Sequence, residues 1–303
     1  MKILLIYYTG TYNTRYVTNK LKARLENEKF KVDTLEVNID TKPVTLNDYD
    51  IIGIGYPIYA FNSPNIFNKY LRKINFLSEK RYFIYKNSGE TLELNNVSSR
   101  VIISILKKYK CKLSNEYHIV MPYNIHFRFD DAFVKEILLY LDKMLEIIAY
   151  DLVNNIENSI EETLKNKFIS SLYTLQRLGG PVNSLFYKID YTKCVKCHIC
   201  MDNCPVHNIT FKNGKYKFHQ RCLMCMRCSF YCPKDAIKIG LYDKWRVNGE
   251  YDFEKIKNND TLKLPYITEQ SDGFYKCFIK TFKDIDERYK EIKKDENLQK
   301  MDR

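Results

Sequence analysis

The chain has 303 residues, 45% of them hydrophobic, so it is long enough for two domains and can bury a substantial core. The formal net charge is +12, but Lys and Glu are mixed throughout with no long basic run, which disfavours nucleic acid as a partner. No apolar stretch reaches the roughly 18 residues that span a membrane, and the amino-terminal residues do not resemble a signal peptide.

Strands and helices alternate five times in the first part of the chain. Strands are predicted at 2–7, 31–37, 50–56, 81–85 and 117–121, and helices at 15–28, 65–74, 96–110 and 131–162. Lys2–Tyr7 is almost wholly apolar, as expected of a strand buried on both faces of a parallel sheet. The alternation predicts a doubly wound five-stranded parallel α/β sheet, in which ligands bind beyond the carboxyl ends of the strands.

The loop after the first strand is rich in hydroxyl and amide side chains. It runs from Thr9 to Thr14 and leads into the first predicted helix. Backbone N–H groups at a helix N-terminus suit a phosphate dianion, and the loop has neither the G-x-G-x-x-G nor the Walker A pattern. We therefore expect a phosphate-binding loop that is not that of a dinucleotide or P-loop enzyme.

Eight of the ten cysteines form two copies of the spacing Cys-x2-Cys-x2-Cys-x3-Cys-Pro. This spacing is typical of bacterial ferredoxins with two 4Fe-4S clusters, in which the fourth cysteine of each run ligates the other run's cluster. The predicted ligand sets are Cys194, Cys197, Cys200 and Cys232 for one cluster, and Cys222, Cys225, Cys228 and Cys204 for the second. Zinc sites and disulfides are the alternatives, but neither predicts four cysteines per run in two copies.

The region between the runs and the rest of the chain complete the predicted organisation. Asn213-Gly214 is predicted at the tip of a two-stranded hairpin. Leu178-Gly-Gly-Pro reads as a linker, because two glycines end the preceding helix and proline prevents its continuation. The predicted divisions are a sheet domain at 1–177, a linker at 178–190, a small α+β cluster domain at 191–240, and a C-terminal extension at 241–303 that packs back on the domains, with a charged helix from about Phe282 and a disordered end.

The phosphate loop resembles the FMN phosphate loop of flavodoxins in its form Ser-Gly-Thr-Gly-Asn-Thr. Thr9, Gly10, Thr11, Asn13 and Thr14 match this form, whereas Tyr12 replaces its second glycine. Together with the cysteine runs, the whole chain resembles the EFR-type ferredoxin family, flavodoxin–ferredoxin fusions of anaerobic bacteria and archaea. The resemblance implies a flavodoxin-like fold and one FMN in addition to two 4Fe-4S clusters.

The same resemblance implies further FMN contacts after the later strands. In the second loop they are Pro57, Tyr59, Ala60 and Phe61, with Tyr59 and Phe61 flanking the flavin ring. In the third loop they are Asn87, Ser88 and Gly89, and after the fifth strand Asn124. If Tyr12 needs a positive φ, its side chain costs conformational freedom that glycine would not.

Three hypotheses of function follow. The first is an electron-transfer protein that passes electrons between the clusters, FMN and a redox protein partner. The second is a flavin-dependent reductase of a small molecule, with Tyr59, Tyr123, His126 and Arg128 as candidate proton donors. The third is a flavodoxin-like binding or regulatory protein that has lost FMN, which Tyr12 keeps open.

The expected charge and cellular location follow from the clusters. Two clusters at about −2 each would lower the formal charge to about +8. This basicity indicates either a docking surface for an acidic redox partner or a solvated lysine-rich surface. Reduced thiols and oxygen-sensitive clusters indicate the cytoplasm.

Overall fold

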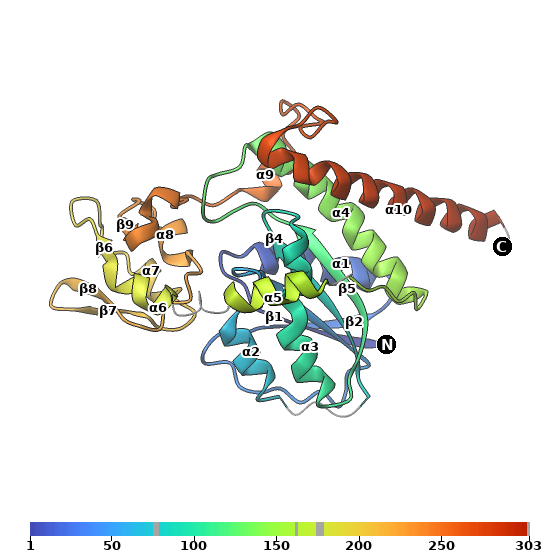
Figure 1. Ribbon diagram of the computed structural model, residues 1–303, viewed down its shortest axis with the longest axis horizontal. Helices are drawn as coiled ribbons and strands as arrows, with labels where there is room; N and C mark the ends of the chain where they lie inside the picture. The colour runs from blue at the N-terminus through green and yellow to red at the C-terminus, as the bar shows by residue number, and fades with distance from the viewer. Residues whose placement is uncertain (75–78, 161–162, 174–178, 302–303) are drawn as a thin grey trace.

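The computed structural model describes residues 1–74, 79–160, 163–173 and 179–301, with the side chains of 299–301 excepted (Figure 1). A five-stranded parallel sheet has the order β2-β1-β3-β4-β5. Its strands are β1 (Lys2–Tyr7), β2 (Lys31–Glu36), β3 (Ile51–Pro57), β4 (Arg81–Ser88) and β5 (Lys112–Val120). This order defines the flavodoxin-like doubly wound fold, so the predicted fold class is confirmed.

Helices cover both faces of the sheet. Strand β1 alternates its side chains, so that Ile3 and Leu5 join one core and Leu4 and Ile6 the other. The first core includes residues of α1 (Asn13–Asn27) and α4 (Asp131–Val153), and the second those of α2 (Asn65–Leu71) and α3 (Arg100–Lys107). Sequence patterning therefore predicted the layers correctly, because the inner strands β1 and β3 are buried on both faces.

Several predicted boundaries need correction. Helix α4 ends at Val153 rather than 162, because Asn155 adopts a left-handed conformation (φ 54°) that stops the helix. Residues 161–162 lie outside the described part of the chain. Strand β5 begins five residues earlier than predicted, since it pairs with β4 from Lys112 onward. A 3-10 helix at Glu93–Ser99 occupies the start of the predicted third helix.

The cysteine-rich module is small and built around two short sheets. Strands β6 (Tyr187–Ile189) and β9 (Ile237–Ile239) pair antiparallel, as do β7 (Ile209–Lys212) and β8 (Lys215–Phe218). The predicted Asn213-Gly214 hairpin is confirmed, with φ of 50° and 75° at its two tip residues. Short helices α7 (Ile199–Asp202) and α8 (Arg227–Phe230) each contain the third cysteine of a run.

The predicted linker contains ordered structure. Leu178 lies outside the described residues, but Gly179–Asn183 form α6, Ser184–Phe186 a 3-10 turn, and β6 ends the segment. Because β6 pairs with β9, the last part of 178–190 is integrated into the cluster module. Helix α5 (Leu164–Tyr173) precedes the gap in the description.

The C-terminal residues return to the sheet domain, as Figure 1 shows in orange and red. A 3-10 segment (Gly240–Trp245) leads to α9 (Phe253–Lys257), a further 3-10 turn (Gly273–Tyr275) and α10 (Lys276–Met301). Helix α10 starts six residues before the predicted position and packs on α4, where Phe278 and Ile292 are fully buried. No helix in the described ranges is long and apolar enough to cross a membrane.

Candidate functional site

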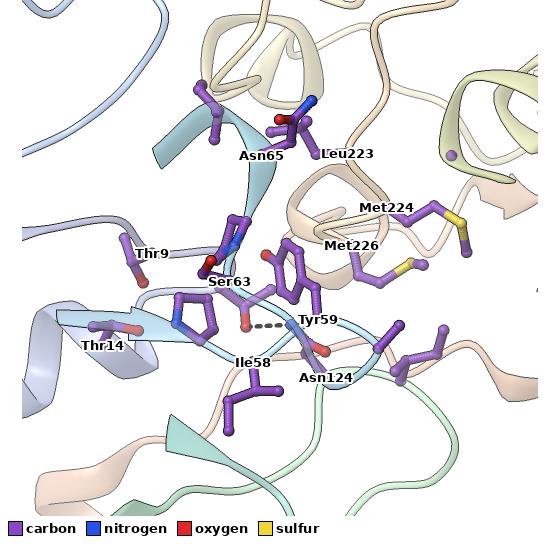
Figure 2. A pocket seen from close by; sticks show the side chains of 18 of the residues that line it. Thr9, Thr14, Ile58, Tyr59, Ser63, Asn65, Asn124, Leu223, Met224 and Met226 are labelled. Atoms are coloured by element: carbon purple, nitrogen blue, oxygen red, sulfur yellow. Dashed lines mark hydrogen bonds between the residues drawn. The ribbon is translucent and has the colours of Figure 1, made fainter. Parts of the chain in front are cut away.

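A cleft of about 1230 Å³ lies where the carboxyl ends of the sheet strands meet the cysteine-rich module. All thirteen residues that the sequence assigned to flavin binding line it: Thr9, Gly10, Thr11, Asn13, Thr14, Pro57, Tyr59, Ala60, Phe61, Asn87, Ser88, Gly89 and Asn124. Figure 2 shows Tyr59 at the centre, with Thr9 and Thr14 to one side and Met224 and Met226 to the other. The cleft is thus shared by both parts of the molecule.

The phosphate loop has unmet hydrogen-bonding capacity. Thr9 is completely buried and its Oγ1 has no hydrogen-bond partner among the described residues. The first backbone N–H groups of α1 have no intrahelical acceptor, as at every helix start. A buried hydroxyl without a partner costs about 1–3 kcal/mol, which a bound oxyanion would offset. The loop therefore fits a phosphate group.

Three hydrogen bonds hold the loops of the cleft together. The Thr14 hydroxyl donates to Asn87 Oδ1 (2.7 Å), and Asn13 Nδ2 donates to the carbonyl of Pro122 (2.8 Å). Asn124 Nδ2 donates to Thr11 Oγ1 at 2.9 Å. Residues after β1, β4 and β5 are thereby tied into one preorganised wall.

Tyr12 adopts a positive φ, the conformation in which a side chain costs more than glycine would. Its φ is 67° and its ψ 0°, in the left-handed region, at the residue that caps α1. The ring lies 3.9 Å from the Arg15 guanidinium and 4.7 Å from that of Arg227, and 5.1 Å from the Tyr231 ring. Cation–π contacts of about 0.5–1 kcal/mol each offset the backbone strain.

Tyr59 and Phe61 take different positions in the cleft. The Tyr59 hydroxyl is buried without a partner and lies so close to Gly10 that a Cβ there would be 2.3 Å away. Burial raises the pKa of Tyr59 above its ordinary value. Phe61 packs edge-on against Tyr173 with ring centroids 4.9 Å apart. The two rings thus have separate neighbours, Gly10 and Tyr173.

A buried polar network supports the third loop. Lys86 is fully buried, and its ammonium lies 2.6 Å from Glu116 Oε1. Ser88 Oγ is 2.7 Å from His118 Nε2. Burial, with a smaller effect of the Lys86 charge, lowers the pKa of His118 to about 3, so the imidazole is neutral. A neutral imidazole on Ser88 fixes the loop that carries Asn87 and Gly89.

The cysteines gather into two groups, each drawing on both runs. Cys194, Cys197, Cys200 and Cys232 line one small pocket with Val195 and Ile199. Cys204 lies within electrostatic reach of Cys222, Cys225 and Cys228. The spacing predicts the same crossed arrangement, and the assignment of each thiol to a cluster stays a prediction. No group of three or more His, Cys, Asp or Glu residues in the described ranges is arranged to hold a single metal ion.

The second group, which we call the inner set, adjoins the flavodoxin-like domain. Cys222 and Met224 line the cleft, and the Cys225 carbonyl accepts from Asn124 Nδ2 at 3.4 Å. Gly180 is needed for close approach, since a Cβ there would lie 2.5 Å from the Cys222 carbonyl. The first group, the outer set, includes the exposed Cys197.

Arg227, between two cysteines of the second run, joins the modules and was missed by the sequence reasoning. Only 7% of it is exposed, and its Nε and Nη2 donate to the carbonyls of Gly10 and Thr9, both at 2.6 Å. Tyr231 adds a hydrogen bond to the Thr11 carbonyl at 3.0 Å. A signal was present in the sequence, because the first run has Ile199 where the second has Arg227.

The candidate proton donors differ in their access to the cleft. Tyr123 and His126 line it, and the Tyr123 hydroxyl donates to Glu90. The His126 N–H donates to the carbonyl of Trp245 at 2.7 Å, and burial lowers the pKa of its imidazole. Arg128 is not part of the cleft lining, since its guanidinium donates to the carbonyls of Gly249 and Glu250. Arg128 is therefore corrected from a candidate donor to a contact with the C-terminal extension.

Comparison with known proteins identifies the cysteine-rich part. Residues 187–210 match the family model of the 4Fe-4S binding domain. NADH-quinone oxidoreductase subunit I 2 of Geobacter metallireducens is 30% identical over 122 residues, 34% of this chain and 87% of that subunit. The chain therefore belongs to the proteins with a 4Fe-4S binding domain, here joined to a flavodoxin-like domain.

Two further matches are partial. A dihydromethanopterin reductase (acceptor) of Methanosarcina mazei is 29% identical over 98 residues, and the chain spans 41% of its length. Oxidised flavodoxin 1 of Bacillus cereus aligns over 48% of this chain and 98% of its own, at 12% identity and a TM-score of 0.37. The assignment of the fold rests on the strand order rather than on this alignment.

Proposed function

We propose that the protein transfers electrons between two 4Fe-4S clusters and one FMN, and exchanges them with a redox protein partner. One observation carries the proposal: Asn124 Nδ2 reaches both Thr11 Oγ1 in the phosphate loop and the carbonyl of Cys225 in the inner set. The inner cysteines and the predicted flavin loops are therefore neighbours, as direct electron exchange requires. The proximity of the two cofactor sites is what a fusion of two carriers would need.

The chain's own residues would hold each group in place. Thr9, Thr11, Asn13 and Thr14, with the N–H groups that start α1, would hold the FMN phosphate. FMN would supply one- and two-electron chemistry, and each cluster one-electron chemistry at low potential. Arg227 keeps the phosphate loop against the inner set, so it positions one site relative to the other.

The two sets would act in order. The outer set includes the exposed Cys197, and around it Tyr191 and Val195 are 44% and 57% exposed beside the exposed Lys193 and Lys196. Apolar side chains beside lysines suit an acidic redox protein. Electrons would pass from that partner to the outer cluster, then to the inner cluster, and then to the flavin.

The test is anaerobic purification followed by iron, sulfide and flavin analysis. We expect about eight irons and eight sulfides per chain and one FMN. After rapid reduction of the clusters, FMN should be reduced at a rate independent of protein concentration. A rate that rises with concentration would contradict transfer within one chain, and one zinc per cysteine run would remove the clusters from the proposal.

A second candidate function is a flavin-dependent reductase of a small molecule. The cleft supports it, because its volume of about 1230 Å³ exceeds the roughly 300–1,000 Å³ of a site for one drug-sized ligand. Tyr123 and His126 line the cleft and are its candidate proton donors. If the anaerobically purified protein does not bind FMN, the result would instead favour the third hypothesis, a flavodoxin-like binding or regulatory protein. We also propose that the chain is a member of the EFR-type family and acts in the cytoplasm.

A further inference from the structure

Basic side chains that do not belong to the phosphate loop line part of the cleft. Four cationic side chains line it: Lys69, Arg72, Lys73 and Arg221. All four are exposed, and none has a carboxylate partner within the described residues. Among the described residues that line the cleft, Glu90 is the one carboxylate. It accepts a hydrogen bond from the Tyr123 hydroxyl. We call the four residues the basic end.

The basic end is built by both modules. Lys69 lies in the last turn of α2, Arg72 is the C-cap residue of this helix, and Lys73 follows it. Arg221 comes from the residue before Cys222 in the cysteine-rich module. Cations at a helix C-terminus stabilise the helix dipole, which accounts for the residues of α2. That effect does not explain why Arg221 joins them on the same cleft from another part of the fold.

The floor of this end is apolar. Ile66 and Tyr70 of α2 and Val206 of the cysteine-rich module are at most 9% exposed, and all line the cleft with Leu223. Figure 2 places Asn65 and Leu223 on one side of Tyr59, and Ile58 and Asn124 on the other. An apolar floor with cations at its margin is the usual form of a small-ligand site.

We propose that the basic end is a second ligand site, for a small molecule with an apolar body and a phosphate or carboxylate group. In the proposed function the phosphate of FMN binds at Thr9–Thr14, so the four cations that line the cleft are left for another anion. The apolar body would rest on Ile66, Tyr70 and Val206, and the anionic group would lie between α2 and Arg221. The ligand would bridge the two modules beside the flavin site.

The second site would lie beside the FMN site of the proposed function. The charge of the four cations does not depend on FMN being bound. Titration calorimetry of anaerobic, FMN-saturated protein with 1-naphthyl phosphate tests it, with 1-naphthoate and 1-naphthol as the carboxylate and uncharged probes. We expect one naphthyl phosphate per chain without release of FMN, and at least about tenfold weaker binding of naphthol. The ratio of phosphate to carboxylate affinity identifies the preferred anion.

Matched variants separate this site from general surface charge. Removing the charges of Arg72, Lys73 and Arg221 by replacement with Gln should weaken naphthyl phosphate binding about 10- to 100-fold, at a few-fold per exposed charge. The control replaces Lys107, Lys108 and Lys280, which are exposed and outside the cleft, with Gln, and should change binding less than about twofold. Iron and FMN contents should be unchanged in both variants.

The outcomes against the site are distinct from those against the flavin. Displacement of FMN by naphthyl phosphate, equal affinity for naphthol, or unchanged affinity in the Arg72, Lys73 and Arg221 variant would each overturn the second site. Protein that retains no FMN would contradict the proposed electron transfer, and the same titration on that protein would still test the basic end.

Discussion

The two cysteine runs have the same spacing but different surroundings. The outer set opens to the surface at Cys197, with exposed Val195 and Ile199 beside it. The inner set faces the flavodoxin-like domain through Cys225 and Arg227. Two copies of one motif therefore have different neighbours, which are the surface for the outer set and the cleft for the inner set.

Burial perturbs thiols of both sets. Burial, with a smaller effect of neighbouring thiols, raises the pKa of Cys222 in the inner set and of Cys200 in the outer set to about 12, and raises the pKa of Cys228 well above its ordinary value. Such thiols become ligands only when iron binding stabilises the thiolate. Cluster assembly at the inner set would thus be linked to the docking of the two modules, since the same residues form the interface.

Removing one ligand from each set gives the largest expected contrast. Cys225→Ser and Cys197→Ser should each lower iron content from about eight to about four per chain. Cys225→Ser should also abolish transfer from the remaining cluster to FMN, because the outer set does not adjoin the cleft. Cys197→Ser should leave the inner cluster able to exchange with FMN. Iron analysis and stopped-flow absorbance measure both effects, and equal flavin reduction in the two variants would contradict the inner and outer assignment.

The residue that distinguishes the two runs should carry the next largest effect. Arg227→Gln removes a buried cation that donates to the carbonyls of Thr9 and Gly10, and should lower the free energy of unfolding by about 3 kcal/mol. The corresponding residue of the first run, Ile199, is 36% exposed, and Ile199→Ala should lower the free energy of unfolding by about 1 kcal/mol or less. Urea unfolding under anaerobic conditions measures both, with iron content as the control. Equal losses of unfolding free energy in the two variants would contradict a stabilising role of Arg227 at the interface between the modules.

The buried Thr9 hydroxyl gives a prediction in which protein stability and FMN affinity change in opposite directions. Thr9→Val keeps the side-chain shape but removes an Oγ1 that has no partner. The variant without FMN should be more stable by about 1–2 kcal/mol, whereas FMN affinity should fall about tenfold. Thermal unfolding without flavin and fluorescence titration with FMN measure the two. Loss of stability in the FMN-free variant would show that the hydroxyl has a partner other than the phosphate.

The smallest effect is expected at Tyr12. Tyr12→Gly relieves the left-handed backbone, worth about 1 kcal/mol, and removes two cation–π contacts of similar total size. Stability and FMN affinity should therefore both change by less than about 1 kcal/mol. An increase in FMN affinity beyond tenfold would indicate that Tyr12 obstructs the loop, and would favour the hypothesis of a domain that has lost FMN.

Much of the fold could be predicted because its signals are local. Alternating burial on β1, the strand and helix order, and the Asn213-Gly214 turn each depend on a few consecutive residues. Element ends were less predictable, since the start of β5 depends on pairing with β4 and the end of α4 on a left-handed Asn155. The residues that the resemblance assigned to the flavin loops line one cleft because strand ends of a parallel sheet converge on one edge.

The sequence by itself determined the ligand chemistry: eight thiols at a spacing that suits two cubanes, and a loop that suits phosphate. Only the tertiary structure decided which thiols adjoin the loop, because Arg227 is more than two hundred residues away from Thr9 and Gly10 in the chain. The basic end is likewise a product of docking, since Arg221 joins Lys69 and Arg72 only across the module boundary. Contacts between distant segments depend on how folded surfaces fit, and no local pattern encodes that fit.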